Sequence, residues 1–182
     1  MAQYPLHPVF KSFSAYLSFD TDLSSSPSGR EQASGQGGAP VVISIKYNKL
    51  SYFEAQKIRA FLVAHRGQQS TFDLYLPLYS DASGDYNGAG LRASAAVVSG
   101  NAVSIKDAEP NKTLTHAGQW IQFAGHDKTY QLVDDMVTDA SGNATAKFEP
   151  SLYEPVALNE QVFIDNVLFK VRANTDMPKF QM

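Results

Sequence analysis

The residues best suited to chemistry lie in one stretch, AGQWIQFAGHDKTYQL, at 117–132. It holds the only tryptophan of the chain and four polar neighbours that suit a ligand pocket: Trp120, His126, Asp127, Lys128 and Tyr130. The same stretch places Gly125 where two alternating apolar runs meet, which is the pattern of a turn between two strands. We favour the hairpin, because it explains the spacing of these residues as well as their types.

Trp120 and Tyr130 carry two alternatives. On a small barrel, rings of this kind stack on a sugar or a base. The competing interpretation is that they pair across the hairpin and fill the barrel, as cross-strand aromatic pairs commonly do. We expect packing, and keep a carbohydrate contact through Trp120 and Tyr130 as the alternative. Few basic residues lie nearby, which argues against nucleic acid.

Two glycine-rich motifs lack the context that their chemistry needs. GAGLRA (88–93) matches a dinucleotide fingerprint, but a loop precedes it and a strand pattern follows, so no helix N-terminus is expected to meet a pyrophosphate. SGDYNG (83–88) begins like a calcium loop, with Ser83, Asp85 and Asn87 in place. Ser94 stands where the bidentate glutamate belongs, so a turn is the better interpretation.

Patterns of catalysis and metal binding are missing from the sequence. The four histidines, His7, His65, His116 and His126, do not have the spacing of metal ligands. The chain contains no cysteine and no G-x-S-x-G motif. Asp134 and Asp135 are adjacent, and on a strand they point to opposite faces. The sequence therefore predicts no catalytic residue, no cofactor and no metal site.

Composition excludes some partners and favours others. The chain has 15 basic and 18 acidic residues without a Lys/Arg cluster, so no specific nucleic-acid recognition is expected. Its apolar runs are too short to span a membrane and no export signal is recognisable, so we expect a soluble protein without membrane insertion. Aromatic residues make up 12% and charged residues only 18%. That much apolar surface must be buried in a core or against a partner, which indicates an assembly.

The first half of the chain predicts strands around one helix. Alternating apolar residues indicate strands at 9–19, 41–47 and 72–76. Ser51 and Glu54 form a capping box at the start of a helix at 51–66, and Gly67 suits a left-handed end. Between the first two strands, residues 24–40 contain five Ser and four Gly without a large apolar side chain. We expect a flexible Ser/Gly loop there.

The second half predicts a small barrel. After the turn-rich segment 81–90, five short strand-like runs follow at 91–98, 102–105, 120–124, 129–133 and 144–148. Five strands in about seventy residues is the size of an oligonucleotide/oligosaccharide-binding (OB) barrel. Two more runs lie in 161–173, and we expect a hairpin that turns at Asp165 and Asn166.

In this order, the elements resemble the distal tail proteins of siphophages over roughly residues 50–177. The resemblance rests on the capped helix SYFEAQKIRAFLVAHRG, the strand FDLYLPLYS, the insert with AGQWIQFAGHDKTYQLVDD and SGNATAKFEPSLYEP, and the returning VFIDNVLFKVRANTDM. It implies a mainly β fold. A ring-forming β-sandwich domain with one α-helix (1–80 and 156–182) is interrupted by an inserted five-stranded OB-like β-barrel (81–155).

The resemblance also implies a function. In that family, the first domain forms a hexameric ring at the tail tip, between the tail tube and the baseplate hub. We therefore expect a structural virion protein without catalytic residues, made in the host cytoplasm. Its expected partners are further copies of itself as a homo-hexamer, the tail tube protein and the baseplate hub protein. Two alternatives stay open: a carbohydrate-binding module that attaches to a host glycan, and a hydrolase with an unrecognised site.

Overall fold

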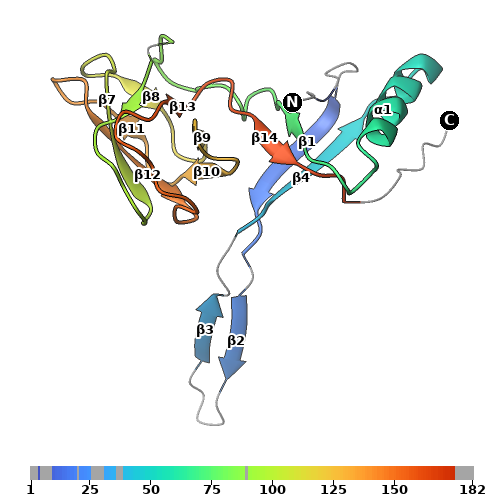
Figure 1. Cartoon of the computed structure of the whole chain (residues 1–182), viewed down its shortest axis with the longest axis horizontal. Coiled ribbons are helices and arrows are strands. Elements are labelled where there is room, and N and C mark those ends of the chain that lie inside the picture. Colours follow the sequence, from blue (N-terminus) through green and yellow to red (C-terminus); the bar gives the residue numbers. More distant parts are fainter. Residues whose placement is uncertain are drawn as a thin grey trace.

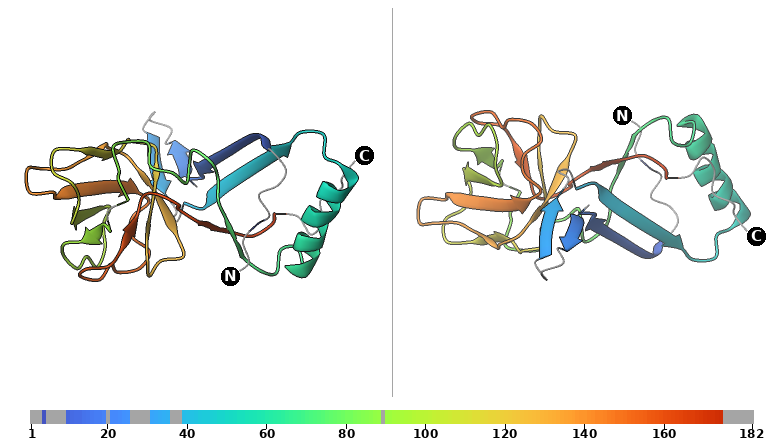
Figure 2. Two further views of the ribbon diagram at one scale, coloured as in Figure 1. Left: turned by 90° about the horizontal axis from the view of Figure 1, so that it is seen from above. Right: turned by 90° about the horizontal axis from the view of Figure 1, so that it is seen from below.

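The computed structural model describes residue 4 and residues 10–19, 21–25, 31–35, 39–88 and 90–174. Within these residues the fold is mainly β with a single helix, as the sequence predicts. The elements form two bodies at opposite ends of an elongated molecule (Figures 1 and 2). We name them the helix body, which holds Tyr4 and the described residues of 10–80 and 165–174, and the barrel body, which holds the described residues of 81–164.

The helix body is built from segments that precede and follow the barrel body in the chain. β1 (Phe10–Leu17) pairs with β4 (Val41–Tyr47), and β5 (Phe72–Leu74) pairs with β14 (Phe169–Val171), each in an antiparallel two-stranded sheet. These sheets lie where the β-sandwich was expected, and both pack with α1 (Tyr52–Ala64) around one core. The fully buried or nearly buried side chains of that core include Ile58, Leu62, Phe72, Leu74, Leu76, Val167 and Phe169.

Both ends of α1 match the sequence signals. The Ser51 side chain accepts a hydrogen bond from the Glu54 N–H at 3.4 Å, and the Glu54 carboxylate accepts from the Ser51 N–H at 2.8 Å. This is the predicted capping box, which satisfies amide groups left free at a helix start. At the other end Gly67 has φ of +61° and donates its N–H to the Leu62 carbonyl at 3.1 Å. The predicted helix is confirmed within two residues at either end.

The predicted flexible loop at 24–40 is wrong in part. β2 (Thr21–Ser25) and β3 (Glu31–Gly35) pair as an antiparallel hairpin, which Figure 1 shows extending from the β1–β4 sheet away from α1 and from the barrel body. Strand pairing uses backbone groups and needs no apolar side chains, and β1 and β4 already hold the two arms in antiparallel register. Residues 26–30 and 36–38 of the predicted loop lie outside the described residues.

The barrel body is a six-stranded, nearly closed sheet instead of the five strands expected. Its strand order is β13 (Val162–Phe163), β9 (Trp120–Phe123), β10 (Thr129–Leu132), β12 (Ala144–Glu149), β7 (Ala102–Lys106) and β6 (Arg92–Ala93). The two outer strands meet, because the Ala93 N–H donates to the Glu160 carbonyl and the Val162 N–H to the Leu91 carbonyl, both at 2.9 Å. β8 (Thr113–Thr115) and β11 (Met136–Val137) form a separate pair.

The hairpin predicted at Asp165 and Asn166 is wrong. β13 pairs with β9 in the barrel body, whereas β14 pairs with β5 in the helix body. The chain therefore crosses between the bodies at these residues, and the barrel ends near Ile164 instead of at 155. Alternation along a strand shows which face is buried, but it does not show which strand is its partner.

The turn at Gly142 gives a test of the barrel. Gly142 has φ of +77°, and a Cβ at this position lies 2.2 Å from the Ala108 carbonyl oxygen. Gly118 has φ of +88°, and a Cβ there has open space around it. Gly118→Ala should cost about 1–2 kcal/mol, the cost of a left-handed alanine. Gly142→Ala pays this cost and also displaces backbone, so we expect a loss above about 3 kcal/mol.

Urea unfolding of both variants and of the wild type measures these losses. Equal losses for the two alanine variants would contradict the close approach of Ala108 to this turn.

Candidate functional site

The stretch that drew attention in the sequence is a hairpin, as predicted. β9 and β10 pair in antiparallel register, and the chain turns between them at Gly125, whose N–H donates to the Glu160 carboxylate at 2.8 Å. In this register Tyr130 is opposite Ile121 and Gln131 is opposite Trp120. Trp120 and Tyr130 are therefore not a cross-strand pair, which corrects that part of the prediction.

Tyr130 fills the barrel. Its side chain is fully buried, and its ring contacts Phe123 and Phe148. His126, also buried, has Nδ1 2.9 Å from the Tyr130 hydroxyl, and the same hydroxyl accepts the Tyr153 N–H at 3.2 Å. Burial raises the pKa of Tyr130 above its usual value. These contacts tie the hairpin to the segment before β13 and leave no free face on the ring.

Trp120 belongs to the other core. Its side chain is 1% exposed, and it lies among the buried residues of the helix body although its backbone is in the barrel body. The indole contacts Phe169 of β14 edge to face, with ring centroids 5.2 Å apart. Within the described residues, the buried Nε1 has no hydrogen-bond partner. Trp120 is thus a side chain of one body that completes the core of the other.

Two polar contacts accompany Trp120 across the junction. The Gln122 side-chain oxygen accepts the Leu168 N–H at 3.3 Å. Asp127, in the turn of the hairpin, forms an ion pair with Lys170 of β14, whose side chain is mostly buried. Lys128 follows Asp127 in the chain, and burial lowers its pKa. The polar residues of the stretch therefore fix the hairpin and the junction, and they do not line a ligand pocket.

The carbohydrate contact predicted for Trp120 and Tyr130 does not fit their positions. A ring that stacks on a sugar must present one face to solvent. Trp120 is 1% exposed and Tyr130 is 0% exposed. Core packing, the interpretation favoured from the sequence, describes both residues.

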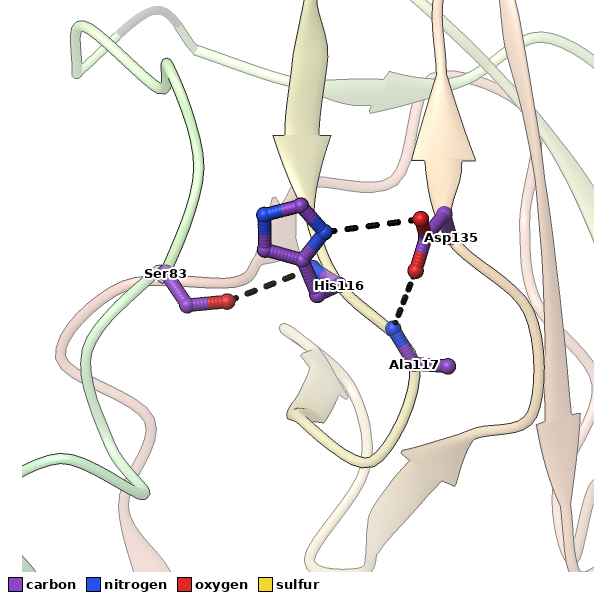
Figure 3. A network of polar contacts seen from close by, with 4 residues as sticks. All are labelled: Ser83, His116, Ala117 and Asp135. Atoms are coloured by element: carbon purple, nitrogen blue, oxygen red, sulfur yellow. Dashed lines mark hydrogen bonds and ion pairs between the residues drawn. The ribbon is translucent and has the colours of Figure 1, made fainter.

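Figure 3 shows a serine, a histidine and an aspartate that lie together on the barrel surface. His116 Nδ1 is 3.4 Å from the Asp135 carboxylate, and both side chains are about half exposed. The Ser83 hydroxyl accepts from the His116 backbone N–H at 3.3 Å and not from the imidazole. In a catalytic triad the serine hydroxyl forms a hydrogen bond with an imidazole nitrogen, which takes up its proton. Ser83 makes no such bond with His116, so this cluster lacks the arrangement of a catalytic triad.

Asp134 and Asp135 lie between β10 and β11 and not on a strand, so the opposite faces expected for them are wrong, but they make separate contacts. Asp134 pairs with Lys147 at 2.8 Å. Asp135 accepts the Ala117 N–H at 2.8 Å, and this bond, followed by the bond with His116, holds the pKa of Asp135 below its usual value. Among the described residues, no group of three or more His, Asp or Glu side chains is placed to hold a metal ion.

The GAGLRA motif ends in the short strand β6 and is not followed by a helix.

The surface of the barrel carries an open hollow of about 530 Å³. Asp134, Asp135, Asp139, Val137, Thr145 and Lys147 are among its lining residues, and we name it the acidic hollow. The N–H groups of Asn143 and Ser141 donate to Asp139 and hold its pKa below the usual value. Asp135 and Asp139 are thus charged at neutral pH, and the hollow is an anionic surface that contains an exposed valine.

Several large apolar side chains of the helix body are exposed, and their exposure was not predicted from the sequence. Six of them are at least half exposed: Tyr16, Phe19, Tyr52, Phe53, Val63 and Leu78. Three of the six lie on α1, although that helix already buries Ile58 and Leu62 on its inner face. The signal was present in the sequence, because apolar residues fall on two sides of the predicted helix instead of one.

Searches against family models and curated proteins found no match. Among the described residues, no helix has the length and apolar character needed to cross a membrane. Function is therefore inferred from the resemblance of the sequence and from the surfaces of this structure.

Trp120 gives the sharpest test of the junction. Trp120→Ala removes a buried indole from the helix-body core, and we expect a loss of stability of about 3–5 kcal/mol. Tyr153→Ala is the matched control, because this ring is 77% exposed and its loss should change stability by less than about 0.5 kcal/mol. Chemical unfolding followed by tryptophan-independent circular dichroism measures both. A Trp120→Ala variant as stable as the control would contradict the shared core.

Proposed function

We propose that this protein is a structural component of a bacteriophage tail tip, where it forms a hexameric ring that joins the tail tube to the baseplate hub. In this role the helix body builds the ring and the barrel body is an inserted domain. The partners are further copies of the chain, the tail tube protein and the baseplate hub protein, and the location is the virion.

The order of elements supports the proposal. The resemblance to distal tail proteins implies a domain made from both ends of the chain, with one capped helix and an inserted small barrel. In the structure, β5 leads into the barrel body and β14 returns from it to pair with β5. This path of the chain supports the proposal.

The observation that carries the proposal is the apolar surface of the helix body. Scattered apolar residues are normal on a protein surface, but three large exposed ones on the single helix α1, two of them in ring contact, suit a protein partner. The β1–β4 sheet adds to this, because no further strand of the described chain pairs with its outer edges. An open strand edge can pair with a strand of another chain, and apolar faces form the buried core of subunit interfaces.

A ring gives each subunit two different contact faces, since the front of one copy meets the back of the next. Such an adaptor binds its neighbours through its surfaces, and it leaves a passage through the opening at its centre. The carbohydrate-binding alternative is not favoured, because the two rings on which it relied are buried.

The ring has a direct test. Native mass spectrometry of the purified chain over a concentration series, with negative-stain imaging of the same sample, should give a six-subunit species with an open centre. Because a ring of separate chains assembles by mass action, the hexamer fraction should rise with concentration. A monomer at the highest concentration would contradict a ring formed by this chain alone.

A further inference from the structure

The outward side of α1 is apolar along its whole length. A helix advances 100° per residue, so the side opposite the buried Ile58 and Leu62 is formed by one row of residues. That row, which we name the outer stripe, consists of Tyr52, Phe53, Gln56, Ala60, Val63 and Ala64, and all six are exposed. Gln56 is its only polar member.

The outer stripe has the character of a buried helix face. Phe53 is 77% exposed, Tyr52 56% and Val63 51%, and the rings of Tyr52 and Phe53 contact each other edge to face. Helices that are apolar on opposite sides are normally covered on both. Ala60 and Ala64 lie one turn apart, and their small side chains let a partner approach the helix closely. The stripe is thus shaped for a partner surface with side chains that project.

Positive charge flanks the outer stripe. Lys57 lies on one side of it and Arg59 on the other, and both are exposed. Glu54, the only acidic residue of α1, is held at the helix start by Ser51. Two outer stripes facing each other would bring lysine and arginine against lysine and arginine, which is unfavourable. The charge pattern therefore selects a partner surface that is apolar and acidic.

The barrel body supplies such a surface. Residues 81–164 contain 11 acidic and 5 basic residues, a net charge of −6, whereas the rest of the chain contains 7 acidic and 10 basic residues, a net charge of +3. The acidic hollow combines three aspartates with Val137, which is 54% exposed. One of the aspartates, Asp134, also forms an ion pair with Lys147 of the same hollow. Apolar contact and opposite charge are both available at this place.

The two surfaces belong to bodies at opposite ends of the molecule, so they do not meet within one chain. Both views of Figure 2 place α1 at one end and the barrel at the other. A basic, apolar end and an acidic end on one rigid chain favour head-to-tail contact between two copies. Contacts of this kind are heterologous, and they close into rings when the rotation between copies permits.

We infer that the outer stripe of α1 docks on the acidic hollow of the barrel body in a second copy of this chain. The inference rests on the proposed ring, and it adds the barrel body to the ring contacts that the proposed function assigns to the helix body. Phe53 and Val63 pack against the Val137 region, while Lys57 and Arg59 lie opposite the aspartates of the neighbour. Because these charges are exposed, added salt weakens the contact.

Two complementary double variants test the inference. Phe53→Asp with Val63→Asp destroys the outer stripe and leaves the hollow intact. Asp134→Asn with Val137→Asn removes one charge and the exposed valine from the hollow without adding a charge that would attract the aspartates of the first variant, and it leaves the stripe intact. All four side chains are at least half exposed, so both variants are expected to fold, which thermal unfolding checks. Tyr153→Asp with Leu158→Asp is the matched control, since these exposed residues lie in neither face.

Native mass spectrometry gives the readout. We expect the wild type and the control to assemble, and each double variant alone to self-associate at least about 30-fold more weakly, as loss of a central contact does. When the two double variants are mixed, each supplies the face that the other lacks. The mixture should form a 1:1 dimer that grows no further, because only one good contact remains.

The outcomes separate this inference from the proposed ring. A closed ring that persists in both double variants would overturn the inference and leave the ring standing. Open chains of the wild type, together with the 1:1 dimer of the mixture, would support the docking and contradict the ring. Two monomeric variants that do not combine would show that the stripe and the hollow are not partners. A wild-type monomer at every concentration would overturn both.

Discussion

The burial of Trp120 is the interaction on which the rest of the structure depends. An indole buries 150–250 Å² of surface, which at about 25 cal/mol per Å² is worth about 4–6 kcal/mol as an upper bound. That amount is a large part of the stability of an ordinary domain. The described part of the helix body has three sheets, each of only two strands, and one helix, and such sheets are marginal by themselves. It therefore takes a central side chain of its core from the other body.

This shared core gives the molecule a fixed shape. Gln122 and Asp127 add polar contacts to Leu168 and Lys170 on either side of the indole, so the barrel cannot turn freely about the two connecting segments. Domains joined only by linkers move relative to each other by default. A subunit with two different contact faces sets the curvature of its assembly through the angle between those faces. Rigid coupling at Trp120 holds that angle constant.

Local signals in the sequence were sufficient to predict the longer helix and strands, but they were insufficient to predict which strands pair. The helix, β4 and the β9–β10 hairpin were predictable, because a capping box, strict alternation and a glycine turn act over a few residues. Two- and three-residue strands such as β8 and β11 are too short to show a period. Alternation placed Trp120 and Ile121 on opposite faces of a strand, but the cover over Trp120 comes from residues far away in the chain. For the same reason β13 and β14, close neighbours in sequence, pair in different bodies.

The outgoing and returning segments of the barrel lie side by side, since Leu74 is paired with Phe169 and the Val167 N–H donates to the Ser80 carbonyl at 2.9 Å. A gap as narrow as that between Ser80 and Val167 can be closed by a tight turn or by another inserted domain, so the connection itself does not require this barrel. Trp120 limits that freedom. Any replacement must bring a bulky apolar side chain to the same place, or the remaining body loses part of its own core. The barrel body can therefore vary at positions away from the junction, but the helix body constrains it at Trp120, which fills part of the helix-body core.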